Sequence, residues 1–185
     1  MLHYSGFMPA LRRDALRNRE RILDAARVLR SDGDALLLNA VAHRAGVGVG
    51  TVYRHFPSIE ALTEALVEHR FVEMTEAAKE AADSTSEFVA IRRFIAQSLQ
   101  TFIDDPDFAR AVVSSTAVRE ETRALRADLF DAFSGLIGRS AQHFRSDLEP
   151  ADIMILLCGL GYSARLRPER SAHYLDALFE GILAR

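Results

Sequence analysis

Residues 39–56, NAVAHRAGVGVGTVYRHF, constrain the fold of this chain more than any other stretch. Ala42 and Ala45 place small apolar groups on one face of a first short helix, so that a second helix can cross it closely. Gly46 follows where the chain needs a residue that tolerates positive φ, and Val52 wedges the second helix against the first. This pattern predicts a helix-turn-helix, whose second helix enters the major groove of DNA. An ordinary αα-hairpin is the alternative that the spacing alone leaves open.

The second predicted helix has an outer face rich in hydrogen-bond donors and positive charge. This face holds Thr51, Tyr53, Arg54 and His55. Such side chains suit contacts with DNA phosphates and base edges.

Arginine is concentrated near the start of the chain. Residues 1–60 hold nine arginines against six acidic residues, a net charge of +3, while the remainder holds fourteen basic against twenty acidic residues, a net charge of −6. This asymmetry fits a nucleic-acid-binding region followed by a region with another role, although chance alone could also produce it. Arg12, Arg13 and Arg17 lie at the open end of a helix predicted over residues 12–30. They are expected to contact phosphates, and a solvated helix face is the alternative.

The composition indicates a folded cytoplasmic protein without a membrane partner. Hydrophobic residues make up 49% of the 185 residues, and the apolar runs are short and interrupted by charge, so we expect no membrane span. The first residues lack the features of a secretory signal. Cys158 is the single cysteine, which excludes an intramolecular disulfide and favours a reducing compartment.

The rest of the chain shows helical periodicity and no strand alternation. After residue 58, helices are predicted over residues 59–82, 87–103, about 108–115, 119–145, 151–166 and 170–184. We therefore expect an all-α fold of about nine helices, with a three-helix DNA-binding domain followed by a helical ligand-binding and dimerisation domain. The expected divisions are a flexible tail at 1–11, the helix-turn-helix domain at 12–57, a connecting helix at 58–83 and the helical domain at 84–185.

Two segments resemble a known family. AGVGVGTVYRHFPSIEAL, residues 45–62, resembles the recognition-helix signature of the TetR family of bacterial transcriptional regulators, and RNRERILDAARVL, residues 17–29, resembles the family's first helix. The specific match covers about residues 12–70, and beyond it the likeness is only architectural. The resemblance implies a non-enzymatic, ligand-responsive regulator, most often a repressor that leaves its pseudo-palindromic operator when a small molecule binds the C-terminal domain.

The resemblance also implies DNA-contacting residues. They are Asn39, Arg44, Gly50, Thr51, Tyr53, Arg54 and His55, and they add to Arg12, Arg13 and Arg17, which are expected from their place on the first helix. Two departures remove contacts that the family usually has. Gly48 replaces a serine that would cap the second helix, and Ile59 stands where a basic residue is usual.

Dimerisation is expected because one small helix reads few base pairs, so two heads are needed for specificity. The last two helices offer small residues for close approach and apolar residues for buried area, and the resemblance points to the same place. The expected interface residues are Gly159, Gly161, Leu175, Leu178, Phe179 and Ile182. The alternative is that these residues form the core of the single chain.

An unknown small-molecule effector is expected to bind in the C-terminal domain, by resemblance rather than by spacing. Candidate lining residues are aromatic or sulfur-containing, although such residues are more often plain core: Phe94, Phe102, Phe130, Phe133, Met154, Cys158 and Tyr162. The sequence has no HExxH motif, no CxxC motif and no phosphate-binding glycine loop after a strand, so no enzyme, metal or cofactor is expected. The alternative function is a helical small-molecule-binding or protein-interaction module without operator binding.

Overall fold

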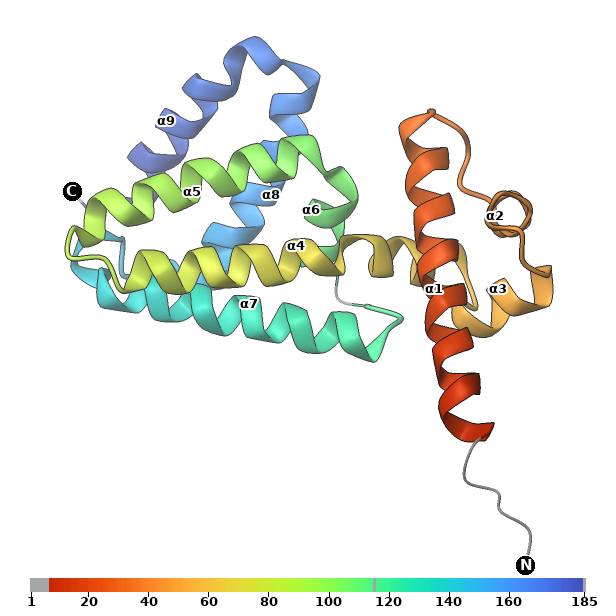
Figure 1. Ribbon diagram of the computed structural model, residues 1–185. Helices are drawn as coiled ribbons and strands as arrows, with labels where there is room; N and C mark the ends of the chain where they lie inside the picture. The colour runs from red at the N-terminus through yellow and green to blue at the C-terminus, as the bar shows by residue number, and fades with distance from the viewer. Residues whose placement is uncertain (1–6, 115, 185) are drawn as a thin grey trace, which may run out of the picture. The chain divides into compact units, whose positions relative to one another are not determined.

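The computed structural model describes residues 7–114 and 116–184, with side chains from Arg13 onward (Figure 1). The chain divides into two compact units, residues 1–66 and residues 67–185, which we call the head and the body. The described residues form nine α-helices and no strand, as expected from the sequence. The helices are α1 (Phe7–Ser31), α2 (Leu38–Ala45), α3 (Val49–His55), α4 (Ile59–Ala82), α5 (Glu87–Asp104), α6 (Pro106–Val113), α7 (Glu120–Arg139), α8 (Pro150–Leu166) and α9 (Ser171–Ile182).

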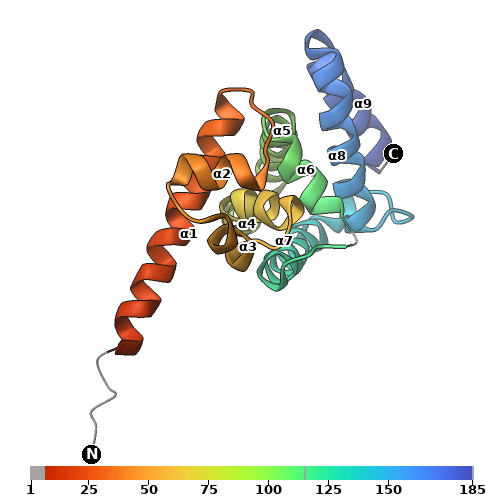
Figure 2. The same ribbon diagram turned by 90° about the vertical axis from the view of Figure 1, so that its right-hand side faces the viewer.

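The head is built on one apolar cluster to which α1, α2, α3 and the start of α4 all contribute. Helix α1 packs against both α2 and α3 (Figures 1 and 2). Val52 of α3 is fully buried, as is Ala42 of α2 to within 1%, which confirms the predicted packing of the two short helices. Ser58 accepts a hydrogen bond from the Ala61 amide at 3.2 Å and so caps the start of α4.

Helix α1 begins earlier than the periodicity predicted. It starts at Phe7 rather than at residue 12, so the prediction of a flexible tail over residues 1–11 is wrong for residues 7–11. Pro9 lies in the first turn of the helix, where a missing backbone N–H costs nothing because that group has no intrahelical partner. Residues 1–6 of the expected tail lie outside the described residues.

The body has a larger core in which phenylalanine side chains from several helices meet. Phe71 of α4 packs edge-on against Phe108 of α6, with ring centroids 4.9 Å apart, and Phe102 of α5 lies 5.6 Å from the same ring. Helices α5 and α8 approach closely at Gly161, where an added Cβ would lie 2.8 Å from Cβ of Phe102. Gly161 therefore allows these two helices of one chain to pack together.

Helix α7 is shorter than predicted. The expected helix over residues 119–145 ends at Arg139, and a 3₁₀ turn follows at Ala141–His143. The next residues pair with the end of α9, because the Arg145 amide donates to the Ile182 carbonyl at 3.0 Å and the Ala184 amide donates to the His143 carbonyl at 2.9 Å. This pairing also explains why α9 ends at Ile182 rather than at residue 184. Among the described helices, none has the length and apolar character needed to cross a membrane.

Candidate DNA interface and ligand pocket

The turn between α2 and α3 depends on Gly46 in two ways. Its φ of 62° lies in the left-handed region that glycine adopts without strain. Its carbonyl accepts a hydrogen bond at 3.2 Å from Nη2 of Arg21, and a Cβ at this position would lie only 3.0 Å from that nitrogen. Arg21 thus ties the turn to α1, and glycine leaves the space for that contact.

The start of α3 is open. Gly48 is the N-cap residue, with extended backbone and no side-chain cap, and its carbonyl accepts from the Thr51 amide at 2.8 Å. A Cβ at Gly50 would meet no atom within 4 Å. The two glycines therefore leave the backbone at this end of the helix free to approach a flat or grooved surface closely.

Three predicted DNA-contacting side chains share the outer part of α3. Tyr53 is half exposed, and Arg54 is exposed and folds back along the helix. Nε of Arg54 donates to the Gly50 carbonyl at 3.1 Å, and Nη2 donates to Oγ1 of Thr51 at 3.2 Å. The guanidinium is thereby held beside the open start of α3.

His55 lies at the end of α3 and is half-buried. Burial lowers its pKa below the ordinary 6.5, and the positive charges of Arg19 and Arg54 lower it further. Near pH 7 His55 is therefore mostly neutral and offers a hydrogen bond rather than a charge.

The arginines of α1 have different surroundings. Arg13 is exposed, and Arg17 is exposed and paired with Asp14 on the same helix. The side chain of Arg12 lies outside the described side chains. Arg19, in contrast, lies over the Phe56 ring with its Cζ 5.7 Å from the centroid, so it stabilises the head.

The two predicted contacts on α2 are exposed at the surface. Asn39 does not cap the helix, because the N-cap residue is Leu37, which has no capping side chain. Arg44 forms a 3.5 Å ion pair with Asp32, and both side chains are about half exposed. Such a pair contributes little to stability, so Arg44 can exchange Asp32 for another anion at low cost.

Sequence reasoning missed Val49. It is the first residue of α3 and is 43% exposed, an unusual place for a large apolar side chain. The signal was present, because Val49 lies between Gly48 and Gly50 and is therefore not needed for the core of the helix pair. In recognition helices the first residues reach base edges, and an apolar group there suits the thymine methyl.

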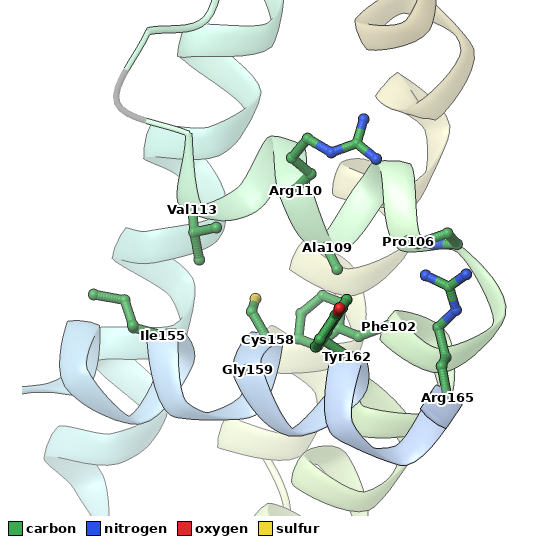
Figure 3. A pocket seen from close by; sticks show the side chains of 10 residues that line it. All are labelled: Phe102, Pro106, Ala109, Arg110, Val113, Ile155, Cys158, Gly159, Tyr162 and Arg165. Carbon is green, nitrogen blue, oxygen red and sulfur yellow. The ribbon is translucent and has the colours of Figure 1, made fainter. Parts of the chain in front are cut away.

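The body contains a pocket of about 450 Å³ between α8 and the α5–α6 corner. Phe102, Cys158 and Tyr162, all predicted ligand residues, line it together, and Figure 3 shows their side chains at its centre. Burial raises the pKa of the Cys158 thiol to about 12, so the thiol is an apolar wall group rather than a nucleophile.

The other predicted ligand residues lie elsewhere. Phe133 and Met154 are fully buried in the body core, and Phe130 is half-buried at its edge. Phe94 lines a separate, smaller hollow of about 210 Å³ between α4 and α5.

Most of the predicted dimer residues are already packed within their own chain. Leu178, Phe179 and Ile182 belong to the body core, and Gly161 contacts Phe102. Leu175 packs at the edge of this core, and Gly159 is exposed with open space around it. These positions thus supply less free surface than their apolar character suggested.

Helix α8 instead presents other apolar side chains to the surface. Ile155 and Leu166 are 55% and 67% exposed, on the side opposite the buried Ile153 and Leu157, and Leu156 beside them is 46% exposed. A helix with both faces apolar usually has other apolar groups packed on each face.

Among the described residues, no group of three or more His, Cys, Asp or Glu could hold a metal ion.

The matches to known proteins centre on the head. Residues 22–66 match the family described as bacterial regulatory proteins, tetR family. The head is a TetR-family helix-turn-helix domain. This confirms the resemblance carried by residues 17–29 and 45–62.

Two curated transcriptional repressors match over part of the chain. The transcriptional repressor LfrR of Mycolicibacterium smegmatis is 40% identical over 85 residues, which is 45% of this chain and 44% of LfrR. The transcriptional repressor KstR of Rhodococcus jostii is 53% identical over 51 residues, which is 26% of this chain and 24% of KstR. The chain thus spans less than half the length of these curated relatives. Both are transcriptional regulators and not enzymes, in line with the expectation from the sequence.

A solved structure extends the likeness to the body. The TetR transcription regulatory protein from Mycobacterium vanbaalenii is 27% identical, with a TM-score of 0.51, over 94% of this chain and 99% of that one. The helical body is therefore a TetR-type C-terminal domain in fold.

Proposed function

We propose that this protein is a dimeric transcriptional repressor that binds operator DNA through α3 and releases it when a small molecule binds the body. The observation that carries this proposal is the Gly46 turn. It places α3 so that Val52 is buried while Tyr53 and Arg54 face outward beside an open helix start. This is the arrangement by which a recognition helix enters the major groove.

The DNA-contacting residues have distinct roles in this proposal. Thr51, Tyr53 and His55 donate to backbone phosphates, and Gly50 allows the close approach. Arg54 and Val49 face the base edges. Asn39, Arg44, Arg12, Arg13 and Arg17 add phosphate contacts that raise affinity without sequence preference.

The dimer forms through α8 and α9 in this proposal. The exposed surface of α8 around Leu156 and Leu166 supports it, since large exposed apolar side chains suit a second copy of the same helix. Leu156→Glu is then expected to convert a dimer to a monomer in sedimentation experiments at micromolar concentration. Val89→Glu is the control, because Val89 is also an exposed apolar residue, at 59% against 46% for Leu156, but lies on α5. A dimer that persists in the Leu156 variant would contradict this interface.

Helix α4 connects the two functions in this proposal, with a DNA-binding domain at residues 12–57 and a ligand-binding and dimerisation domain at 84–185. A ligand can release the operator only by as much as it prefers the non-binding conformation. A repressor of this kind works in the cytoplasm, where its operator lies.

A mobility-shift assay with the DNA upstream of the protein's own coding region tests the proposal. We expect a shift whose affinity falls steeply with salt, because each phosphate contact releases counterions. The double variant Tyr53→Ala with Arg54→Ala should lose the shift, whereas Arg93→Ala, an exposed arginine on α5, should keep it. If the unmodified protein gives no shift at low salt, operator binding is refuted. The alternative is then favoured, a helical small-molecule-binding or protein-interaction module that does not bind an operator.

A further inference from the structure

The pocket between α8 and the α5–α6 corner has a charged end and an apolar end. Figure 3 shows Arg165 and Arg110 on the side of Pro106, and Val113 and Ile155 toward the opposite side. The side chains of Cys158, Phe102 and Tyr162 lie between them. A ligand that fills this space would therefore meet charge at one end and hydrocarbon at the other.

The two arginines of the charged end differ in their partners. Arg110 forms a 3.0 Å ion pair with Asp107 on its own helix, so its charge is largely balanced. Arg165 is exposed and has no ion-pair partner among the described residues. The pocket thus offers one uncompensated positive charge, in a body whose net charge is negative.

The apolar end is made of side chains that are usually buried. Val113 is 43% exposed and Ile155 is 55% exposed, and Tyr162, between the two ends, is 64% exposed. Phe102 and Ala109 form the buried wall behind them. Exposed apolar groups that converge on one hollow gain free energy when a ligand covers them.

From this geometry we propose that the pocket binds a monoanionic carboxylic acid with an apolar body, its carboxylate on Arg165 and its hydrocarbon against Val113 and Ile155. One planar guanidinium matches one carboxylate through two parallel hydrogen bonds. A ligand with two negative charges would leave one of them uncompensated, and a cation would be repelled. A volume of about 450 Å³ suits a small molecule. We infer that this acid is the effector class of the proposed repressor. Binding of the acid does not depend on the repressor function, but release of the operator by the acid does.

Calorimetric titration with decanoate, below its micelle concentration, tests the ligand class directly. Decanol and decyltrimethylammonium serve as uncharged and cationic analogues of equal chain length, and decyl phosphate as the second anion. We expect decanoate to bind about tenfold or more tightly than decanol, since a hydrogen bond to a charged group is stronger than one between neutral groups. Octanoate should bind more weakly than decanoate by about fourfold for each methylene lost.

Variants locate the two ends of the ligand. Arg165→Gln is expected to weaken decanoate about tenfold and to leave decanol unchanged, and Arg110→Gln is expected to have a smaller effect because Asp107 already balances that charge. Val113→Ser should weaken decanoate and decanol alike. Arg93→Gln is the matched control, because Arg93 is an exposed arginine of α5 that does not line the pocket. The Arg93→Gln variant should bind decanoate with the same affinity as the unmodified protein.

Equal affinity for decanoate and decanol, or an unchanged decanoate affinity in the Arg165 variant, would overturn the proposal. So would tighter binding of decyl phosphate, which would indicate a dianionic ligand instead. The mobility-shift assay reads the proposed function separately. If the protein prefers decanoate to decanol but never shifts DNA, the repressor function is refuted and the ligand class stands. If it shifts DNA but does not prefer decanoate, the ligand class is refuted and the repressor function stands.

Discussion

The head and the body are both helical, but they use apolar residues differently. The described core of the head is made of small and aliphatic side chains with a single aromatic ring, that of Phe56. The core of the body gathers rings from five helices, α4 to α7 and α9, among them Phe71, Phe102 and Phe108. In the head each small residue has a specific geometric task, whereas in the body many combinations of large side chains would fill the same space. This difference fits the family match, which covers residues 22–66 of the head.

Truncating one buried phenylalanine in each region gives the largest expected effect. Phe56→Ala and Phe102→Ala should each lower the free energy of unfolding by about 3–5 kcal/mol, because each ring is fully buried and leaves a cavity. We expect Phe56→Ala to raise amide hydrogen exchange in α2 and α3 while α5 and α8 stay protected, and Phe102→Ala to do the opposite. Loss of protection in α5 and α8 of the Phe56 variant would mean that the two regions unfold as one.

The same difference decides how much the sequence could predict. Gly46 and Val52 were predicted in their observed roles because a tight turn and a close helix crossing accept few residue types. The end of α7 could not be predicted, because it depends on the pairing of residue 144 with residue 183, which are distant in sequence.

The ligand pocket shows the same limit on sequence reasoning. Phe102 and Phe133 are indistinguishable as aromatic residues on helical faces, yet only Phe102 lines the pocket with Tyr162. Arg165 carries no sequence signal at all, since its proposed role arises from its position at one end of a cavity and from having no ion-pair partner among the described residues.

The dependence of the head on backbone geometry can be tested at its two glycines with positive φ. Gly33→Ala should cost about 1–2 kcal/mol from left-handed strain alone, since its Cβ would meet no atom within 4 Å. Gly46→Ala should cost more, because its Cβ would also lie 3.0 Å from Nη2 of Arg21. Denaturant unfolding of both variants measures the difference. In an Arg21→Met background, Gly46→Ala should lower the free energy of unfolding by no more than Gly33→Ala does. If the two glycine variants lose the same free energy while Arg21 is present, Arg21 does not crowd the Cβ at position 46.

The apolar position in the recognition helix is the next and smaller effect. Val49→Ala should weaken binding to a selected operator by about fourfold, the amount expected for a lost methyl contact. Replacing one thymine of that operator by uracil should weaken the unmodified protein equally and leave the Val49 variant unaffected. Titrations of fluorescent duplexes measure both changes. Val89→Ala, an exposed valine on α5, should still discriminate thymine from uracil. If no thymine position distinguishes the Val49 variant from the unmodified protein, Val49 does not face the bases.

The smallest effect concerns His55, whose pKa is lowered by burial and by Arg19 and Arg54. The imidazole of the unfolded chain has the ordinary pKa of 6.5 and is therefore protonated at a higher pH than that of the folded chain. Its contribution to the free energy of unfolding is constant well above pH 6.5 and decreases as the pH falls below that value. DNA binding should respond in the opposite direction, since a phosphate beside His55 favours its charged form and affinity therefore rises as the pH falls. Thermal unfolding and operator titration between pH 5.5 and about 7.5 measure the two trends. In His55→Gln, both the thermal stability and the operator affinity should depend less on pH. A pH dependence that remains unchanged in this variant comes from another titratable group.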